Sequence, residues 1–177
     1  MTEALLEHVR EVDDFPQPGI RFFDLNPIYA RPELFDALVE ELRASLDRLI
    51  DVSAVDYVVG PDARGFIAGT RLAAALGCGF LATRKPSKLP PPVSSVSYGL
   101  EYGESILELS AHMPLAGAKV IVHDDVLATG GTAAASAELL ARAGAEVVAF
   151  SFSLEVAALS GSDNLPSGVP VAIVLSS

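Results

Sequence analysis

Two adjacent carboxylates at the end of a predicted strand are the residues whose types and spacing most clearly suggest chemistry. Asp124 and Asp125 follow four largely apolar residues, 120–123, which predict a buried strand. Open α/β sheets bind their ligands at the carboxyl ends of the strands, which is where this strand would place both acids. Ionised carboxylates only accept hydrogen bonds, so the pair suits the vicinal hydroxyls of a sugar, or a metal ion bridging to them.

A loop of small residues follows the two acids and predicts a phosphate site. Gly130 and Gly131 permit positive φ and close backbone approach, so the loop amides can point at an anion. A helix predicted over residues 133–140 would begin directly behind the loop, and helix N-termini favour phosphate groups. The two threonine hydroxyls add further donors. The residues expected to bind the phosphate are Ala128, Thr129, Gly130, Gly131 and Thr132.

The acids and the loop together fit a 5-phosphorylated ribose, which offers one dianion and vicinal hydroxyls. The alternative is an ordinary turn between a strand and a helix, in which Asp124 or Asp125 caps the helix and the glycines only turn the chain. One acid and one glycine would fit that alternative well. Two adjacent acids followed by Thr-Gly-Gly-Thr favour the phosphate site.

The remaining segments predict the sheet that must position these residues. Periodicity predicts helices at 5–12, 32–50 and 67–76, and strands at 55–59, 80–83, 147–154 and 169–174. Their alternation indicates the α/β class, with a mainly parallel central sheet flanked by helices. Two further strands, at 93–98 and 105–109, form an excursion from this sheet. Residues 1–177 are expected to form a single domain.

Composition and charge exclude several classes of partner. Half of the 177 residues are apolar, yet no apolar run approaches the roughly 20 residues that cross a bilayer. Residues 1–14 lack the pattern of a secretory signal, so a cytoplasmic protein with no membrane partner is expected. The net charge of −11 argues against nucleic acids, which need a basic surface. Cys78 is the only cysteine, which excludes an intrachain disulfide.

Five segments, taken in order, resemble the type I phosphoribosyltransferases, and most closely the branch that acts on adenine. The segments are residues 14–25, 60–66, 84–90, 98–103 and 120–132. The resemblance implies the family fold, with a small N-terminal hood over about residues 1–30 and a flexible, strand-rich flap over about 84–110. It also implies purine salvage by a homodimer: adenine and 5-phospho-α-D-ribose 1-diphosphate (PRPP) give AMP and diphosphate. Mg²⁺ would be held mainly by PRPP, with Asp124 or Asp125 as the candidate protein ligand.

The hood is expected to hold the purine through Ile20, Arg21 and Phe22. An uncharged base needs an aromatic or apolar face and a few hydrogen bonds to its edge, which Phe22 and the neighbouring backbone can supply. Without the resemblance, a proline-rich surface loop with its aromatic rings in the core would be favoured. Arg21 stands where the family often has an apolar residue.

The resemblance implies catalytic roles for Glu101, Lys88 and Arg64, and PRPP-binding roles for Arg84 and Lys85. Arg64 follows a strand and would reach the side of the site that holds the diphosphate and the base. The alternative interpretation of Arg64 is a surface ion pair with Asp62. Arg84, Lys85 and Lys88 form a basic loop, which would stabilise the charge that develops on the leaving diphosphate. Lys88 could belong to either subunit. Glu101 in the flap would approach the ribose or the base.

Other readings of the same residues stay open. The chemistry could act on xanthine, hypoxanthine or guanine, because side-chain identity alone does not fix the edge of the base that the hood recognises. A non-catalytic regulator that senses PRPP or a nucleotide could also use this fold. His123 is expected to be a core or sheet-face histidine rather than a ligand, because strand alternation points it away from Asp124.

Overall fold

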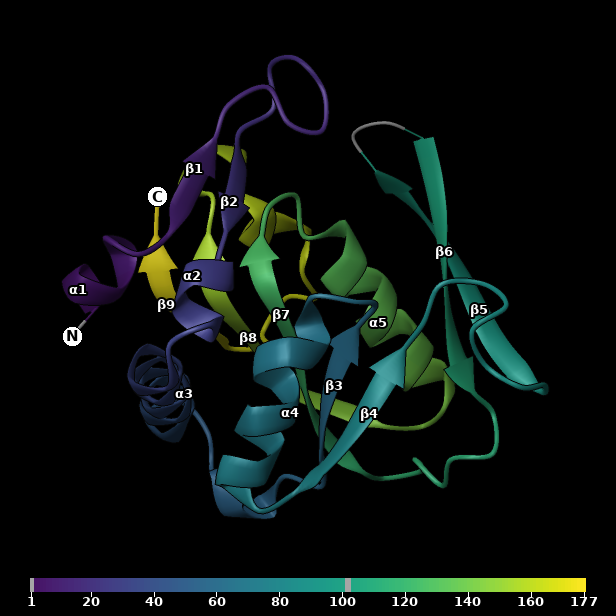
Figure 1. Cartoon of the computed structure of the whole chain (residues 1–177). Helices are drawn as coiled ribbons and strands as arrows, with labels where there is room; N and C mark the ends of the chain where they lie inside the picture. The colour runs from purple at the N-terminus through teal and green to yellow at the C-terminus, as the bar shows by residue number, and fades with distance from the viewer. Residues whose placement is uncertain (1, 101–102) are drawn as a thin grey trace.

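The computed structural model describes residues 2–100 and 103–177, and its centre is a five-stranded parallel sheet (Figure 1). The strands, in spatial order, are β4 (Gly79–Thr83), β3 (Tyr57–Pro61), β7 (Lys119–Leu127), β8 (Glu146–Glu155) and β9 (Val171–Ser176). Each neighbouring pair runs parallel, so all the strands end at one edge of the sheet, and β7 lies in the middle. The predicted α/β class with a mainly parallel sheet is confirmed.

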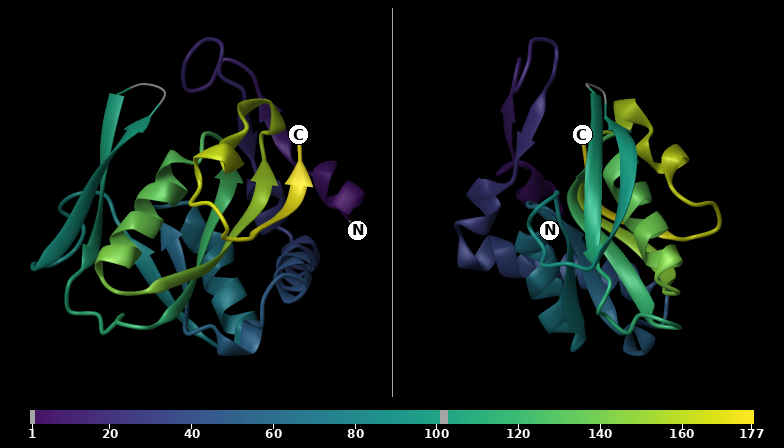
Figure 2. Two further views of the ribbon diagram at one scale, coloured as in Figure 1. Left: turned by 180° about the vertical axis from the view of Figure 1, so that it is seen from behind. Right: turned by 90° about the vertical axis from the view of Figure 1, so that its right-hand side faces the viewer.

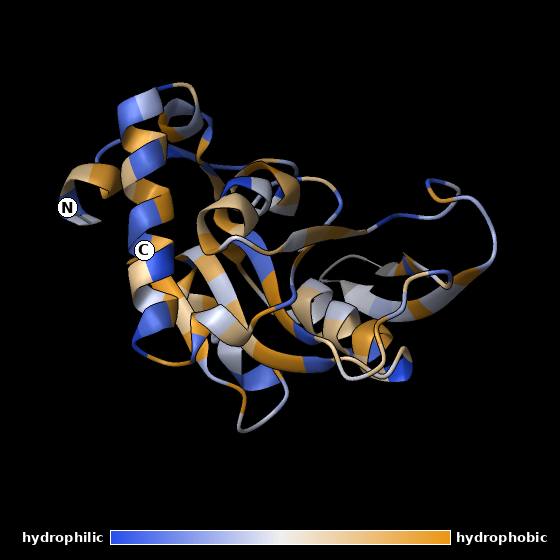
Figure 3. Cartoon of the chain, turned by 90° about the horizontal axis from the view of Figure 1, so that it is seen from below, coloured by the Kyte–Doolittle hydropathy of each residue, from blue (hydrophilic) through white to orange (hydrophobic). Residues whose placement is uncertain are grey.

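Helices cover both faces of this sheet. α3 (Pro32–Asp47) and α4 (Gly65–Leu76) pack on one face, and α5 (Gly131–Arg142) packs on the other. Side-chain alternation along β7 supplies both cores, since Ile121 joins the first and Val122 the second. Polar and apolar residues alternate around α3, whose apolar side faces the sheet (Figure 3). Both layers therefore hold β7 rigidly from either side.

Two antiparallel hairpins project past the carboxyl edge of the sheet (Figures 1 and 2). They are formed by β1 (Arg10–Val12) with β2 (Phe22–Asp24), and by β5 (Val93–Leu100) with β6 (Gly103–Ser110). The loop that leaves β7 lies between them (Figure 1). The remaining helical segments are α1 (Thr2–Leu6), α2 (Asn26–Tyr29) and the 3₁₀ turns Val52–Ala54, Ala157–Leu159 and Gly161–Asn164.

The helix predicted over residues 5–12 is wrong in its second half. The helix ends at Leu6, and Arg10–Val12 forms β1, with Arg10 opposite Asp24 and Val12 opposite Phe22. The valines of this segment fit either period, and backbone pairing with β2, a partner distant in sequence, decides in favour of the strand. In the parts of the chain that the structure describes, no helix is long and apolar enough to span a bilayer.

Candidate active site

The acid pair lies on the central strand, close to the carboxyl edge of the sheet. β7 continues through Asp124 and Asp125 to Leu127, further than the predicted strand, because its pairing with β8 continues to Glu155. Asp125 is almost completely buried, whereas Asp124 is partly exposed to the cleft described below. Each carboxylate accepts a hydrogen bond from the amide of the following residue, at 2.9 Å for Asp124 and 2.8 Å for Asp125. Both acids are therefore fixed by the backbone.

Arg64 joins the acid pair to the N-terminal hairpin. Its Nε lies 3.2 Å from Oδ2 of Asp125, and its guanidinium lies 4.9 Å from the centre of the Phe22 ring. The surface ion pair with Asp62 that the sequence left open for Arg64 is instead made by Arg84, at 2.9 Å. Arg64 thus lies in the crevice, between the residue expected to stack on the base and one of the acids expected to hold the ribose.

Ionisation of the two carboxyls of the acid pair is energetically unfavourable. Burial raises the pKa of both groups, and the charge of Asp125 raises that of Asp124 further, while Arg64 opposes the rise at Asp125. Burial raises the pKa of the Tyr29 phenol, and the charges of both acids raise it further, so the phenol stays protonated. A hydroxyl donor or a cation that reached Asp124 would relieve this uncompensated charge.

Residues 128–132, which we call the phosphate loop after the ligand that the sequence predicts for them, connect β7 to α5 and include the start of that helix. Gly130 adopts φ +79°, and α5 begins at Gly131, two residues before the predicted start. Among the described residues no side chain caps this helix, so its first amides remain available to an anion. The hydroxyl of Thr132 donates to the Tyr98 hydroxyl at 3.4 Å, which connects the loop to the β5–β6 hairpin.

One cleft of about 570 Å³ brings these parts together. Phosphate-loop residues 128–132, Asp124, Arg64 and Lys85 contribute polar groups, while Ile20 and Phe22 contribute the face of the N-terminal hairpin. The apolar walls come from Val126, Leu127, Ala133 and Phe152, and Pro16 and Gln17 complete the lining. The apolar positions on β7 and β8, which are Val126, Leu127 and Phe152, give no chemical signal in the sequence. They become part of the site only because the two strands end side by side.

The N-terminal hairpin presents only some of its expected base-binding residues to the cleft. Ile20 and Phe22 line it, and Phe15 packs edge-on against Phe22 with ring centres 5.2 Å apart. The Arg21 side chain points elsewhere, because its Nε pairs with Asp13 at 2.8 Å and its guanidinium also contacts Glu11. Arg21 therefore does not line the cleft, although its neighbours Ile20 and Phe22 do.

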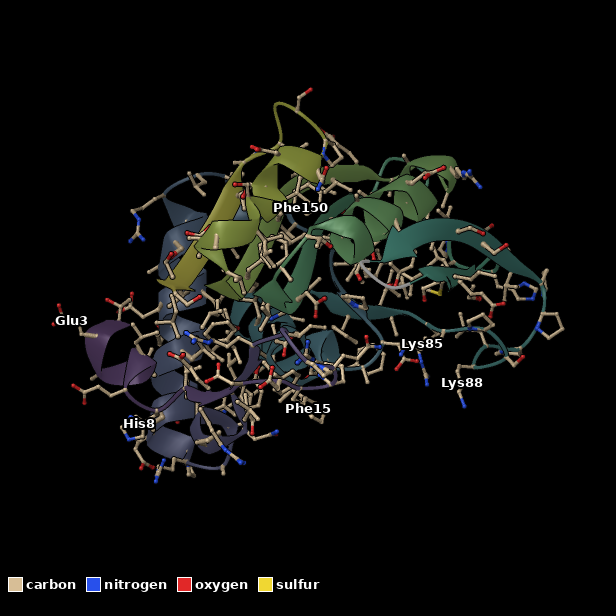
Figure 4. The ribbon with its side chains drawn as sticks, turned by 90° about the horizontal axis from the view of Figure 1, so that it is seen from above. Glu3, His8, Phe15, Lys85, Lys88 and Phe150 are labelled. Atoms are coloured by element: carbon tan, nitrogen blue, oxygen red, sulfur yellow. The ribbon has the colours of Figure 1, made fainter. Side chains whose placement is uncertain are left out.

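The basic loop after β4 spreads its cations over different surroundings. The Arg84 guanidinium contacts Asp62 and lies 5.4 Å from the centre of the Phe66 ring, and its backbone pairs with Glu108 of β6. Lys85 lines the cleft, whereas Lys88 is exposed further along the loop (Figure 4). Glu101, the expected flap carboxylate, lies outside the described residues.

His123 is held inside the sheet rather than in the cleft. It is fully buried beside Gly69 of α4, and its Nδ1 lies 3.2 Å from the Ser151 hydroxyl. Its Nε2 has no hydrogen-bond partner in the described portion of the chain. Burial lowers its pKa to about 4, so the imidazole is neutral at physiological pH. His123 therefore acts as a core residue in this arrangement.

Known proteins share both the sequence and the fold of this chain. Residues 28–163 match the model of the phosphoribosyl transferase domain. An adenine phosphoribosyltransferase from a Synechococcus strain is 50% identical over 94% of each chain. The crystal structure of the Rhodothermus marinus adenine phosphoribosyltransferase is 42% identical, with a TM-score of 0.92 over 99% of this chain and 98% of its own.

A third relative carries ligands. The Saccharomyces cerevisiae adenine phosphoribosyltransferase, complexed with an imino-altritol bisphosphate and adenine, is 36% identical, with a TM-score of 0.90 over 98% of each chain. The matches extend over the hairpins as well as the sheet, and so include every segment that builds the cleft. The chain therefore belongs to the phosphoribosyltransferase family, within the group of the adenine phosphoribosyltransferases.

Proposed function

We propose that this protein salvages purine by converting adenine and PRPP to AMP and diphosphate. The observation that carries the proposal is the single cleft in which phosphate-loop residues 128–132, Asp124 and Phe22 all face the same space. Those groups match the phosphate, the ribose hydroxyls and the base of one nucleotide. The relatives described above are named for adenine, and the yeast protein holds adenine in its crystal structure.

In this proposal the 5-phosphate of PRPP binds at the start of α5. The amides of residues 129–132 and the hydroxyls of Thr129 and Thr132 donate to its oxygens, with the helix dipole favouring the dianion. Asp124 accepts hydrogen bonds from the ribose hydroxyls, and Asp125 orients Arg64 through their 3.2 Å contact while sharing in the ribose site. The partly exposed Asp124 carboxylate is the one open to the cleft.

Adenine lies between the N-terminal hairpin and the apolar end of the sheet. The hairpin acts as the hood, with the Phe22 ring as the stacking surface and the backbone at Ile20 and Arg21 as the source of hydrogen bonds to the edge of the base. In the described structure the Arg64 guanidinium lies over Phe22. A base that stacks on that ring must therefore share it with Arg64 or displace Arg64 toward the diphosphate.

The reaction breaks the bond between the anomeric carbon and the diphosphate oxygen, and N9 of adenine forms the new bond on the opposite face. The diphosphate leaves with the electron pair of the broken bond, and the N9 proton must be released from the base. Arg64 and Lys85 line the cleft, and with Arg84 and Lys88 they neutralise the departing charge. Glu101 is proposed to stabilise positive charge on the ribose or to take the proton. Positioning and electrostatics supply the catalysis.

Magnesium fits the donors of this site. Mg²⁺ prefers oxygen ligands and is commonly held by one or two carboxylates together with substrate phosphates. Asp124 offers a carboxylate whose pKa is raised by burial, so a nearby cation would stabilise its charged form. Bound Mg²⁺ would neutralise the diphosphate of PRPP, with Asp124 or Asp125 as its protein ligand. We propose further that the enzyme works in the cytoplasm, as a homodimer in which Lys88 serves its own or the partner site.

The proposal is tested by mixing the purified protein with PRPP, Mg²⁺ and each of adenine, hypoxanthine, guanine and xanthine, and measuring diphosphate release. Release with adenine at a rate well above the other bases is expected. Preferred turnover of guanine, hypoxanthine or xanthine would refute the specificity. Binding of PRPP without turnover of any base would refute the enzyme activity and favour a sensor.

A further inference from the structure

The 3₁₀ turn Gly161–Asn164, which follows β8, packs against the phosphate loop at residues 128–130. The Asn164 side chain donates from Nδ2 to the carbonyl oxygen of Thr129 at 2.8 Å. A Cβ added at Gly161 would collide with the carbonyl oxygen of Ala128, and one added at Gly130 would collide with the carbonyl oxygen of Gly161. The 3₁₀ turn and the loop therefore meet backbone to backbone, with one side-chain hydrogen bond between them.

These contacts set the direction of the peptide groups in the loop. In a trans peptide the C=O and the N–H point in opposite directions. Because the carbonyl of Thr129 points at Asn164, the N–H of Gly130 in the same peptide unit points away from Asn164. Thr129 and Gly130 line the 570 Å³ cleft, whereas Asn164 lines a separate cavity of about 460 Å³ that also borders Thr129. The amide of Gly130 therefore points away from the turn that holds Asn164, and Gly130 itself lines the cleft.

The carbonyl of Ala128 repeats this arrangement one residue earlier. It is directed at Gly161, so the N–H of Thr129 points away from the 3₁₀ turn. α5 has no side-chain cap among the described residues, and Gly130 with φ +79° has a wide choice of backbone conformations. The contacts from Gly161 and Asn164 thus restrict the loop at residues 128–130, while the hydrogen bond from Thr132 to Tyr98 restrains its other end.

We propose that Asn164 is a positioning residue for the phosphate-binding amides, an inference that rests on the proposed transferase function. Asn164 does not touch the substrate. It holds the Thr129–Gly130 peptide in the orientation that a 5-phosphate needs, so that the loop pays less ordering entropy on binding. A net hydrogen bond of about 1 kcal/mol corresponds to about a fivefold change in affinity.

The test compares Asn164→Leu, which keeps the size of the side chain but loses the donor, with Asn164→Gln, which keeps the amide. Asp163→Asn is the matched control, because Asp163 is an exposed residue of the same turn. Steady-state kinetics should give Asn164→Leu a KM for PRPP raised about fivefold, with kcat and the KM for adenine unchanged. Asn164→Gln should recover most of the affinity, and Asp163→Asn should match the wild type.

Equal KM values for PRPP in all four proteins would overturn the inference, and so would a loss of kcat and adenine affinity that parallels a fall in the melting temperature. If the wild type itself does not turn over adenine, the proposed function fails while the inference can still be judged. Calorimetric titration with ribose 5-phosphate then provides the comparison. A weaker dissociation constant for Asn164→Leu alone supports the positioning role, and equal constants overturn it.

Discussion

Replacing Gly65 with alanine should push the start of α4 away from the acid pair. A Cβ at this position would lie 2.7 Å from Cδ of Pro61, 2.9 Å from the carbonyl oxygen of His123 and 3.1 Å from Oδ1 of Asp124. Ordinary contact begins at 3.4 Å, so the three distances are short by 0.7, 0.5 and 0.3 Å. Pro61 and His123 belong to central strands that cannot yield, so α4 must move by about half an ångström.

The cost follows from this displacement. Overpacking of a well-packed site costs about 1–3 kcal/mol, and alanine recovers up to about 1 kcal/mol of helix propensity. A net loss of about 1–2 kcal/mol should lower the melting temperature by about 2–8 °C. Because a misplacement of about 1 Å can reduce turnover about a hundredfold, a shift of half that size at Arg64, next to the start of α4, should reduce kcat/KM about tenfold.

Differential scanning calorimetry and steady-state kinetics with PRPP and adenine measure both effects. Gly69→Ala is the matched control, one helical turn further on, where the new Cβ would meet only side chains, Phe80 at 3.0 Å and His123 at 3.3 Å. That variant should keep the wild-type kcat/KM and nearly the wild-type melting temperature. Equal kcat/KM values and melting temperatures for Gly65→Ala and Gly69→Ala would show that the start of α4 does not position Arg64 in the cleft.

Three further substitutions test the acid pair, the buried histidine and the hood. At pH 8 Asp124→Asn should raise the melting temperature while reducing kcat/KM at least tenfold, since burial raises the pKa of this carboxyl and its charge therefore destabilises the fold above that pKa. In urea, the free energy of unfolding of the wild type should fall by up to about 3 kcal/mol through His123 as the pH drops from 6.5 toward 4, because the folded imidazole has a pKa of about 4. The free energy of unfolding of His123→Asn should fall by less over the same range. Phe22→Leu should raise the KM for adenine about tenfold without changing that for PRPP, and equal effects on both substrates would contradict the stacking role.

The parts of the site that could be predicted from the sequence are contiguous in the chain. Residues 120–142 contain, without interruption, the strand, the two acids, the phosphate loop and α5. Local periodicity and the backbone freedom of glycine are therefore enough to predict these parts and their sequence along the chain. The parallel sheet could also be predicted, because each strand is followed by a helix or by a turn with a clear signal. The local pattern of segment 5–12 favours a helix over its whole length, because nothing local to it reveals the β2 partner.

The contacts that join distant segments could not be predicted from the sequence. Arg64 pairs with Asp125 rather than with its neighbour Asp62, and Arg21 turns away from the cleft to Asp13. Both outcomes depend on where α4 and the N-terminal hairpin come to rest on the sheet. The support that Asn164 gives to Thr129 spans 35 residues of sequence, and an asparagine in a turn ordinarily indicates only the turn.

A crystal structure of the protein with AMP would show whether one nucleotide fills the cleft. We expect the phosphate to lie against the amides of residues 129–132, the ribose hydroxyls to lie within hydrogen-bond distance of Asp124, and the adenine ring to stack on Phe22. A phosphate bound away from this loop, or a base outside the N-terminal hairpin, would contradict this arrangement.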